Sequence, residues 1–327
     1  MRAFTCAVCG QLVFFDNTVC LRCGSDLGFD WVARELRSRP AAPWCANRGL
    51  IGCNGLADRP GALCAACALT RTRPDWDDAP ALVAWADAER AKRRLVYELG
   101  ELQLPLPAWF ERPGGLAFDL LSSSRVPVTT GHAGGVVTLD LAESDDAHRE
   151  RMRIDMGEPY RTLLGHFRHE VGHFYFPLLV TDDATRARAR ELFGDEREDY
   201  AAALERHYAF GPPAGWDRDH VSAYATMHAA EDWAETFAHV LHLHDTLQTA
   251  AAYGLRVEGP AGRPDLHAEP IDPEAGGLRS ELSDWLGLTY ALNAINRSLG
   301  FDDLYPFLLS GPVIEKLSFV DRLIARA

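Results

Sequence analysis

All eight cysteines of this 327-residue chain lie between Cys6 and Cys67. Cysteine clusters in a reducing compartment more often bind metal than form disulfides. The first four form two C-x2-C turns, each followed by glycine, in CAVCG and CLRCG. Two such turns, joined by a short β-hairpin, let four thiolates converge on one tetrahedral ion. The spacing therefore predicts a zinc ribbon whose structural zinc is held by Cys6, Cys9, Cys20 and Cys23.

The other four cysteines follow a looser pattern, C-x7-C-x10-C-x2-C. This pattern predicts a second structural zinc, held by Cys45, Cys53, Cys64 and Cys67. The alternatives are buried or free thiols around a single zinc, or a pairing that interleaves the two sets. Four thiolates leave no coordination position for water, so neither set is expected to be catalytic. A module this small has little core, and its folding is expected to depend on the metal.

Composition and charge exclude several classes of protein. The hydrophobic fraction of 47% is that of a globular chain. No apolar run approaches the roughly 18–20 residues of a membrane helix, and the start, MRAFTCAVCG, lacks a secretory h-region. We therefore expect a cytoplasmic protein without a membrane partner. The net charge is −14, while residues 1–70 hold seven arginines against five acidic residues. An acidic body repels phosphate, so nucleic acid is not an expected partner; the oligomeric state stays open.

The order of patterns indicates two domains, a cysteine module at 1–70 and a body at 71–327, with a polar linker at 68–80. Strand-like runs precede most helical patterns in the body, which predicts an α+β fold and not a parallel α/β fold. Residues 256–277 read as a Pro/Gly-rich loop. Strands are expected at 116–121 and 135–141, and helices near 81–99, 160–176, 196–208, 226–253, 279–299 and 312–326.

The stretch LLGHFRHEVGHFYF contains H-E-x-x-H, formed by His169, Glu170 and His173. On a helix, positions i and i+4 share a face, so both imidazoles can bind one zinc ion. Glu170 follows the first ligand and can act as general base toward a metal-activated water. Gly172 suits a helix that passes close to another backbone. His166 is interpreted as a core or supporting residue and not as a ligand.

A third protein ligand must come from another segment, and the long helical pattern MHAAEDWAETFAHVLHLH offers candidates. Glu231 and Glu235 share one helical face, so one can bind zinc while the other supports a ligand histidine. His239 continues that face one turn later and is the rival ligand. Spacing alone does not choose among the three.

The residues H169-E-V-G-H173 and E231-D-W-A-E235 resemble the gluzincin clan of zinc metallopeptidases. With the paired CxxCG turns and the LAESDD stretch, nearly the whole chain resembles the bacterial putative zinc-binding metallopeptidases that carry an N-terminal zinc ribbon. The resemblance implies a zincin-like body, with a mixed sheet plus active-site and ligand helices. It also implies that Glu231 is the third zinc ligand and that Glu235 is hydrogen-bonded to a ligand histidine. Glu235 replaces the aspartate of thermolysin-like members, as in the lethal-factor-like branch.

That branch also carries a tyrosine seven residues before the ligand glutamate, which corresponds to Tyr224. The resemblance implies that Tyr224 stabilises the oxyanion of the tetrahedral intermediate. His228, nearby in the sequence, is a second candidate for that role. The resemblance further implies that Val136–Leu141 is the edge strand beside the cleft, to which an extended peptide substrate could pair.

The sequence thus predicts a zinc-dependent metallopeptidase with one catalytic and two structural zinc ions and a peptide or protein substrate. One alternative is a zinc-dependent amidase acting on a non-protein amide, which the same ligands would serve. The other is a non-enzymatic protein whose zinc ribbon binds a partner. The intact Glu170 argues against this last interpretation, since a scaffold needs no carboxylate there.

Overall fold

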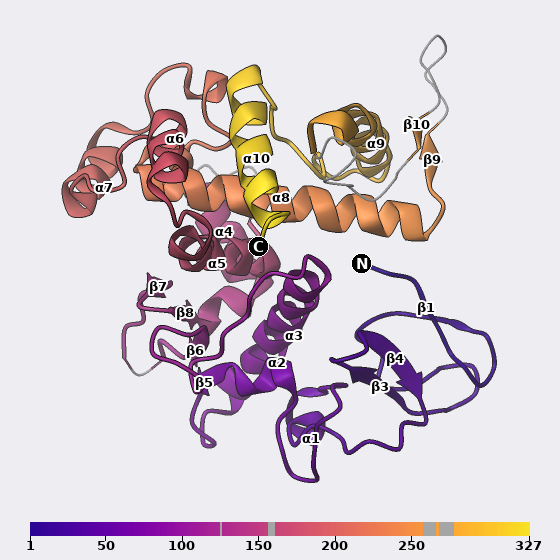
Figure 1. Cartoon of the computed structure of the whole chain (residues 1–327). Coiled ribbons are helices and arrows are strands. Elements are labelled where there is room, and N and C mark those ends of the chain that lie inside the picture. The colour runs from indigo at the N-terminus through magenta and orange to yellow at the C-terminus, as the bar shows by residue number, and fades with distance from the viewer. Residues whose placement is uncertain (125, 156–160, 258–265, 268–277) are drawn as a thin grey trace. The chain divides into compact units, whose positions relative to one another are not determined.

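The computed structural model describes residues 1–124, 126–155, 161–257, 266–267 and 278–327. Contacts divide the chain into two compact units (Figure 1). The amino-terminal unit comprises Arg2–Met152 with Thr162–Phe167, and the carboxy-terminal unit comprises Arg168–Ala327 with Met1 and Arg153–Arg161. The domain boundary expected at residue 70 lies inside the amino-terminal unit. The division of the chain into a cysteine module and a metallopeptidase-like body stays a prediction.

The cysteine module is built from two short antiparallel ladders. Strand β1 (Phe4–Thr5) pairs with β2 (Leu12–Val13), and β3 (Leu27–Asp30) pairs with β4 (Glu35–Ser38). The first C-x2-C turn connects β1 to β2, as the ribbon pattern predicts. Two four-residue helices follow, α1 (Arg48–Ile51) and α2 (Ala65–Ala68).

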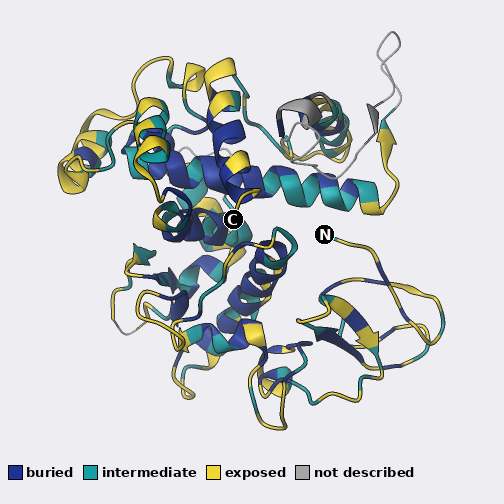
Figure 2. Ribbon diagram, in the orientation of Figure 1, coloured by how far each residue is buried: buried dark blue, intermediate teal, exposed yellow. Residues whose placement is uncertain are grey.

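Aromatic side chains join this module to the long helix α3 (Ala79–Glu101). The rings of Phe15 and Phe29 lie 4.8 Å apart, and both contact Tyr97 of α3, at 5.0 and 5.7 Å. The same helix carries a buried ion pair, in which Lys92 Nζ lies 2.9 Å from Glu89 Oε1 and neither side chain is exposed. Figure 2 shows α3 as largely buried. The helix is therefore a core element of this unit.

A four-stranded mixed sheet completes the amino-terminal unit, in the order β5-β6-β8-β7. Its strands are β5 (Thr70–Thr72), β6 (Ala117–Leu121), β7 (Gly131–Ala133) and β8 (Val136–Asp140). Strand β6 is parallel to both neighbours, and β7 is antiparallel to β8. The predicted linker at 68–80 is therefore partly a strand. The α+β class with a mixed sheet is confirmed.

The expectation that Val136–Leu141 forms an edge strand is wrong, because β8 lies between β6 and β7. The reason is local. Gly134 and Gly135 have φ of +57° and +90°, which favours a two-residue hairpin turn. The turn places Gly131–Ala133 beside β8, so β7 takes the edge.

The sheet is followed by the 3-10 helix η1 (Leu141–Ser144) and by the helices α4 (Asp146–Asp155) and α5 (Leu163–Leu179). Both α4 and α5 begin in the amino-terminal unit and end in the carboxy-terminal unit. The H-E-x-x-H residues lie on α5, entirely after the point where the carboxy-terminal unit begins at Arg168.

The carboxy-terminal unit is helical and is organised around α8 (Ala229–Ala252), which α6 and α10 contact (Figure 1). Lys316 Nζ on α10 hydrogen-bonds to Asp232 Oδ2 on α8 over 2.5 Å, and both side chains are buried. The remaining elements of this unit are α6 (Asp183–Phe193), α7 (Tyr200–Phe210), η2 (Trp216–Arg218), η3 (Tyr224–Thr226), β9 (Arg256–Val257), β10 (Leu266–His267), α9 (Leu278–Ser298) and α10 (Gly311–Ile324).

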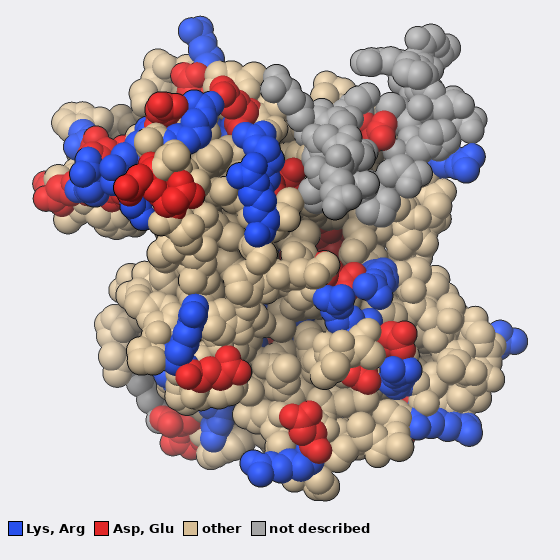
Figure 3. Space-filling view, viewed as in Figure 1, with Lys and Arg blue, Asp and Glu red and all other residues tan. Residues whose placement is uncertain are grey.

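The predicted helices match α3, α5, α7, α8, α9 and α10 in type, whereas α1, α2, α4 and α6 have no counterpart among the predicted elements. Most of the predicted loop at 256–277 lies outside the described residues. Among the described residues, no helix combines the length and hydropathy that a membrane crossing requires. On the face seen in Figure 3, acidic and basic side chains are intermixed.

Candidate metal centre

Helix α5 positions the H-E-x-x-H residues, and its packing depends on Gly172. His169 and Glu170 are buried, and His173 is half-buried. A Cβ atom at position 172 would lie 3.0 Å from the Cα of Ala234 on α8. Trp233 of α8 also donates its indole N–H to the Gly172 carbonyl over 2.8 Å. The absent side chain thus lets α5 and α8 pack closely, which brings the motif against the candidate third ligand.

His228 caps the N-terminus of α8, and its Nδ1 accepts a hydrogen bond from the backbone N–H of Ala230 over 3.1 Å. This cap places Glu231 in the first turn and Glu235 in the second, on one face. Asp232 contacts Lys316 of α10 instead. The position at which α8 begins therefore determines that the carboxylates of Glu231 and Glu235 face the histidines of α5.

Three side chains converge between the two helices. The Nε2 atoms of His169 and His173 lie 3.3 Å apart, and Glu231 Oε2 lies 2.9 Å from His169 Nε2. One ligand atom from each of the three residues lies within 4.8 Å of the others. Glu235 lies behind this group and accepts the Nδ1–H of His169 over 2.7 Å. The structure thus brings together the residues that the sequence and the resemblance selected.

The chemistry of these atoms fits a metal cation. Nδ1 of His169 is engaged by Glu235, so its Nε2 faces the cluster. Burial opposes protonation of His169, but the carboxylates of Glu231 and Glu235 outweigh it and raise its pKa well above the usual range, so a metal ion at this point would bind Nε2 in place of a proton. Glu231 Oε2 is buried and receives no hydrogen bond. Burial opposes the ionisation of Glu231, but the neighbouring His169 and His173 outweigh it and hold the pKa of Glu231 well below its usual range. Nitrogen and carboxylate donors around one point are a zinc-type ligand set that leaves a position for water.

His239, the rival ligand, lies elsewhere. Its Nδ1 is 2.9 Å from the hydroxyl of Tyr305, and its ring lies 4.4 Å from that of Phe307. Burial lowers the pKa of His239 to about 4, so the imidazole is neutral. The geometry favours Glu231 as the third ligand.

The two oxyanion candidates, Tyr224 and His228, differ in what their side chains contact. Tyr224 is the first residue of η3, and its ring lies 6.0 Å from that of His169. His228 uses both ring nitrogens within the protein, since Nδ1 caps α8 and Nε2 donates to the Glu198 carbonyl over 3.1 Å. This arrangement favours Tyr224 over His228 as a donor to a substrate oxyanion.

Sequence reasoning missed Tyr200, the first residue of α7. Its hydroxyl donates to Glu231 Oε1 over 3.0 Å. Burial and the carboxylates of Glu231 and Glu170 raise the pKa of Tyr200, so the phenol keeps its proton at neutral pH. No spacing in the sequence relates residue 200 to residue 231, and only the tertiary packing of α7 shows the contact.

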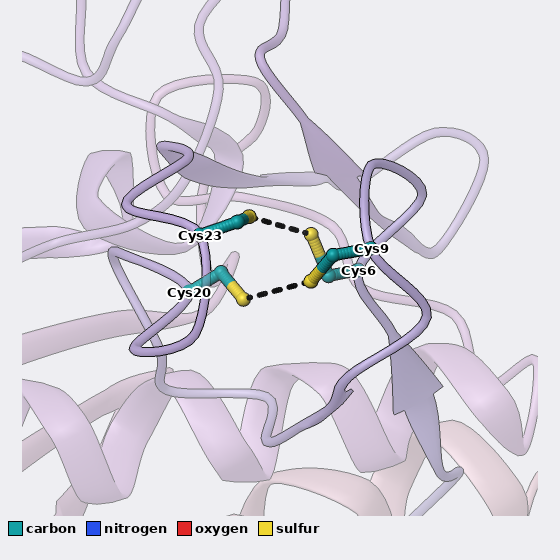
Figure 4. Close-up of side chains that lie close together, drawn as sticks. All are labelled: Cys6, Cys9, Cys20 and Cys23. Carbon is teal, nitrogen blue, oxygen red and sulfur yellow. Dashed lines mark hydrogen bonds between the residues drawn. The ribbon is translucent and has the colours of Figure 1, made fainter.

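The eight cysteines form two separate tetrads in the amino-terminal unit, and no pairing interleaves them. In the first, Cys6 Sγ lies 3.6 Å from Cys23 Sγ, and Cys9 Sγ lies 3.7 Å from Cys20 Sγ (Figure 4). Zinc–sulfur bonds of about 2.3 Å in a tetrahedron place sulfur atoms about 3.8 Å apart, whereas a disulfide requires about 2.05 Å. A hydrogen bond from Ser38 lowers the pKa of Cys6 to about 6, which favours the thiolate.

The second tetrad has the same dimensions. Cys53 Sγ lies 3.7 Å from Cys64 Sγ and 3.5 Å from Cys67 Sγ, and the four residues, completed by Cys45, are buried. Backbone N–H groups of Gly55 and Cys64 donate to Cys53 and Cys45 sulfur, each over 3.3 Å. Such donors stabilise negative charge on sulfur, as a thiolate–zinc site requires.

Comparison with known proteins agrees with this ligand chemistry. A family described as “Putative zinc-binding metallo-peptidase” matches residues 81–323, which contain His169, His173 and Glu231. The chain belongs to this family. A zinc-ribbon domain family matches residues 3–44, which contain the complete first tetrad. The second tetrad lies between the ribbon match and the metallo-peptidase match.

Relatives of this metallo-peptidase family member occur in mycobacteria. Uncharacterized proteins of Mycobacterium tuberculosis and Mycobacterium bovis are each 50% identical to the chain over 331 residues. The alignments cover 99% of this chain and 95% of each relative. No solved structure matches the chain.

Proposed function

We propose that the chain is a zinc metallopeptidase of the H-E-x-x-H, gluzincin type that hydrolyses peptide bonds. The observation that carries the proposal is the convergence of His169, His173 and the buried Glu231, whose ligand atoms lie within 4.8 Å of one another. These three residues would hold the catalytic zinc, and Glu235 would orient His169. The two cysteine tetrads would each hold a structural zinc.

A zinc ion held by these residues would supply an activated water and polarise a carbonyl group. Glu170 follows His169 on α5 and is buried beside the cluster. In the proposed mechanism its carboxylate accepts the proton of the attacking water and passes it to the leaving amine. Tyr224, with His228 as the less favoured candidate, donates to the developing oxyanion. A peptide or protein is the proposed substrate class.

We place the protein in the cytoplasm. Eight thiols arranged as tetrads, at distances that suit zinc and not disulfides, are typical of a reducing compartment.

The test compares the parent protein with Glu170→Gln, both with measured zinc content, on a peptide library generated from a whole proteome. Glutamine is nearly isosteric but cannot accept the proton, so cleavage should fall at least ~10²-fold while zinc is retained. Glu205→Gln, an exposed glutamate on α7, is the control and should cleave as the parent does. A zinc-loaded parent that cleaves no peptide would contradict a peptidase, and full activity in Glu170→Gln would contradict the general base.

A further inference from the structure

The two oxygens of the Glu231 carboxylate have different surroundings. Oε2 lies 2.9 Å from His169 Nε2 and receives no hydrogen bond. Oε1 lies 3.5 Å from His173 Nε2 and accepts the hydroxyl proton of Tyr200 over 3.0 Å. Oε2 thus faces His169, while Oε1, which lies near His173, is engaged by a hydrogen-bond donor from a third helix, α7.

Tyr200 is held in this position by the ends of two helices. Asp199 caps α7 by accepting from the backbone N–H of Ala202 over 3.1 Å, which fixes the first turn. The ring of Tyr200 packs edge-on against that of His228, with centroids 5.3 Å apart. His228 in turn caps α8 and donates to the carbonyl of Glu198, the residue before Asp199. The start of α7 and the start of α8 are therefore joined, and the phenol is directed at the first turn of α8.

We propose that Tyr200 is a positioning residue for the metal centre, which it serves by occupying Glu231 Oε1 so that only Oε2 is presented to the ion. The inference rests on the proposed function, since it assigns to Tyr200 control of how a ligand of that site binds. A carboxylate can bind a metal through one oxygen or through both. A hydrogen bond to one oxygen restrains the rotation of the carboxylate and favours the one-oxygen mode, which keeps a coordination position open for water.

Tyr200→Phe tests this role, because it removes only the hydroxyl and keeps the ring that packs on His228. Tyr208→Phe is the matched control, because Tyr208 lies on the same helix and is 66% exposed. Zinc affinity is measured by competition with a chromophoric chelator at fixed pH. Outer partners of metal ligands typically contribute 10–100-fold in affinity. We expect a loss of that order for Tyr200→Phe and none for Tyr208→Phe.

The second readout is the visible spectrum of the cobalt-substituted protein, which reports coordination geometry independently of turnover. The spectrum of the His169→Ala protein is subtracted, so that signals from the cysteine tetrads cancel. In Tyr200→Phe the released Oε1 can join the coordination shell, so the bands should weaken as the coordination number rises. Tyr208→Phe should show the parent spectrum.

The outcomes separate this inference from the proposed function. A loss of affinity together with a changed spectrum supports the role of Tyr200. If either readout is unchanged in Tyr200→Phe while the parent binds metal, the role of Tyr200 is refuted and the metal centre stands. If the parent binds no more metal than His169→Ala, the metal centre and the role of Tyr200 fall together. Zinc retained in the tetrads of every variant shows that the comparison is between folded proteins.

Discussion

His169 donates its Nδ1 proton to the carboxylate of Glu235 over 2.7 Å, across the contact between helices α5 and α8. This bond orients the imidazole, because with Nδ1 engaged by Glu235 the Nε2 atom is the one left to bind a metal in place of its proton. Glu235 therefore acts on the candidate metal centre through His169, while Glu231, one turn earlier on α8, faces the metal position itself.

Substitutions of Glu231, Glu235 and His239 on α8 should distinguish a zinc ligand from a residue that only orients a ligand. We expect Glu231→Ala to empty the site, because two protein ligands remain. Glu235→Ala should weaken zinc binding ~10–100-fold. His239→Ala should bind zinc nearly as the parent does, because His239 is hydrogen-bonded to Tyr305. Occupancy of the site in the three variants is measured at fixed pH, since protons compete with the metal for its ligands. An empty site in His239→Ala with a filled one in Glu231→Ala would replace the assignment with a three-histidine site.

Elemental analysis should find three zinc ions per chain, two in the tetrads and one between α5 and α8. The tetrads offer four soft thiolates each, whereas the third site offers two imidazoles and a carboxylate and leaves a position open. A chelator should therefore remove one zinc first, with circular dichroism unchanged. One zinc per chain, or eight reactive thiols in the native protein, would contradict the two tetrad sites.

Gly172→Val should lower the free energy of unfolding by about 1–3 kcal/mol, the usual effect of overpacking. The added side chain would start 3.0 Å from the Ala234 Cα, and backbone cannot move aside as a flexible side chain can. Gly100→Ala in α3 is the control, since the nearest atom to its Cβ is an arginine side-chain carbon at 3.8 Å. That substitution should stabilise by up to about 1 kcal/mol, the helix preference of alanine over glycine. Denaturant titration of zinc-loaded proteins measures both, and equal stability of Gly172→Val and the parent would show that α5 and α8 can separate freely.

Acid should destabilise the carboxy-terminal unit through His239. Burial lowers the pKa of this group from 6.5 to about 4, although Glu235 opposes the shift. Below pH 6.5 the unfolded chain therefore binds a proton that the folded protein does not. The free energy of unfolding should fall between pH 6.5 and pH 4, by at most about 3 kcal/mol from this group.

The same prediction is checked with His239→Gln, which removes the titrating group. Tyr305 and His242 face the imidazole as well and remain in the variant. The difference in unfolding free energy between parent and variant should shrink as the pH is lowered, since only the parent loses the contribution of His239. A difference that stays constant from pH 7 to pH 5 would show that His239 titrates alike in both states.

The sequence could predict those parts of the site that depend on local geometry. Helical spacing places His169 with His173 and Glu231 with Glu235, and the structure keeps both pairs on single helices. The contact of Tyr200 with Glu231 depends on how α7 packs, which no local pattern encodes.

The fold shows the same division between local and tertiary information. The alternation in Val136–Leu141 predicts a strand, but its place in the sheet depends on its neighbours. The adjacent Gly134-Gly135 pair was a usable hairpin signal for β7. Helix α6 was missed because its sequence, DATRARARELF, has few apolar positions to mark a buried face.

Lys92 and Lys316 are the two lysines of the chain, and each is buried against a carboxylate, Glu89 and Asp232 respectively. The folded protein therefore presents arginine as its surface cation and offers no lysine amine to solvent. Acylating reagents, reductive alkylation and isopeptide tagging at lysine would therefore require α3 to be exposed from the core of its unit, or α10 to separate from α8. Lysine modification of this protein would thus report opening of its structure, in the way that hydrogen exchange reports it for backbone amides.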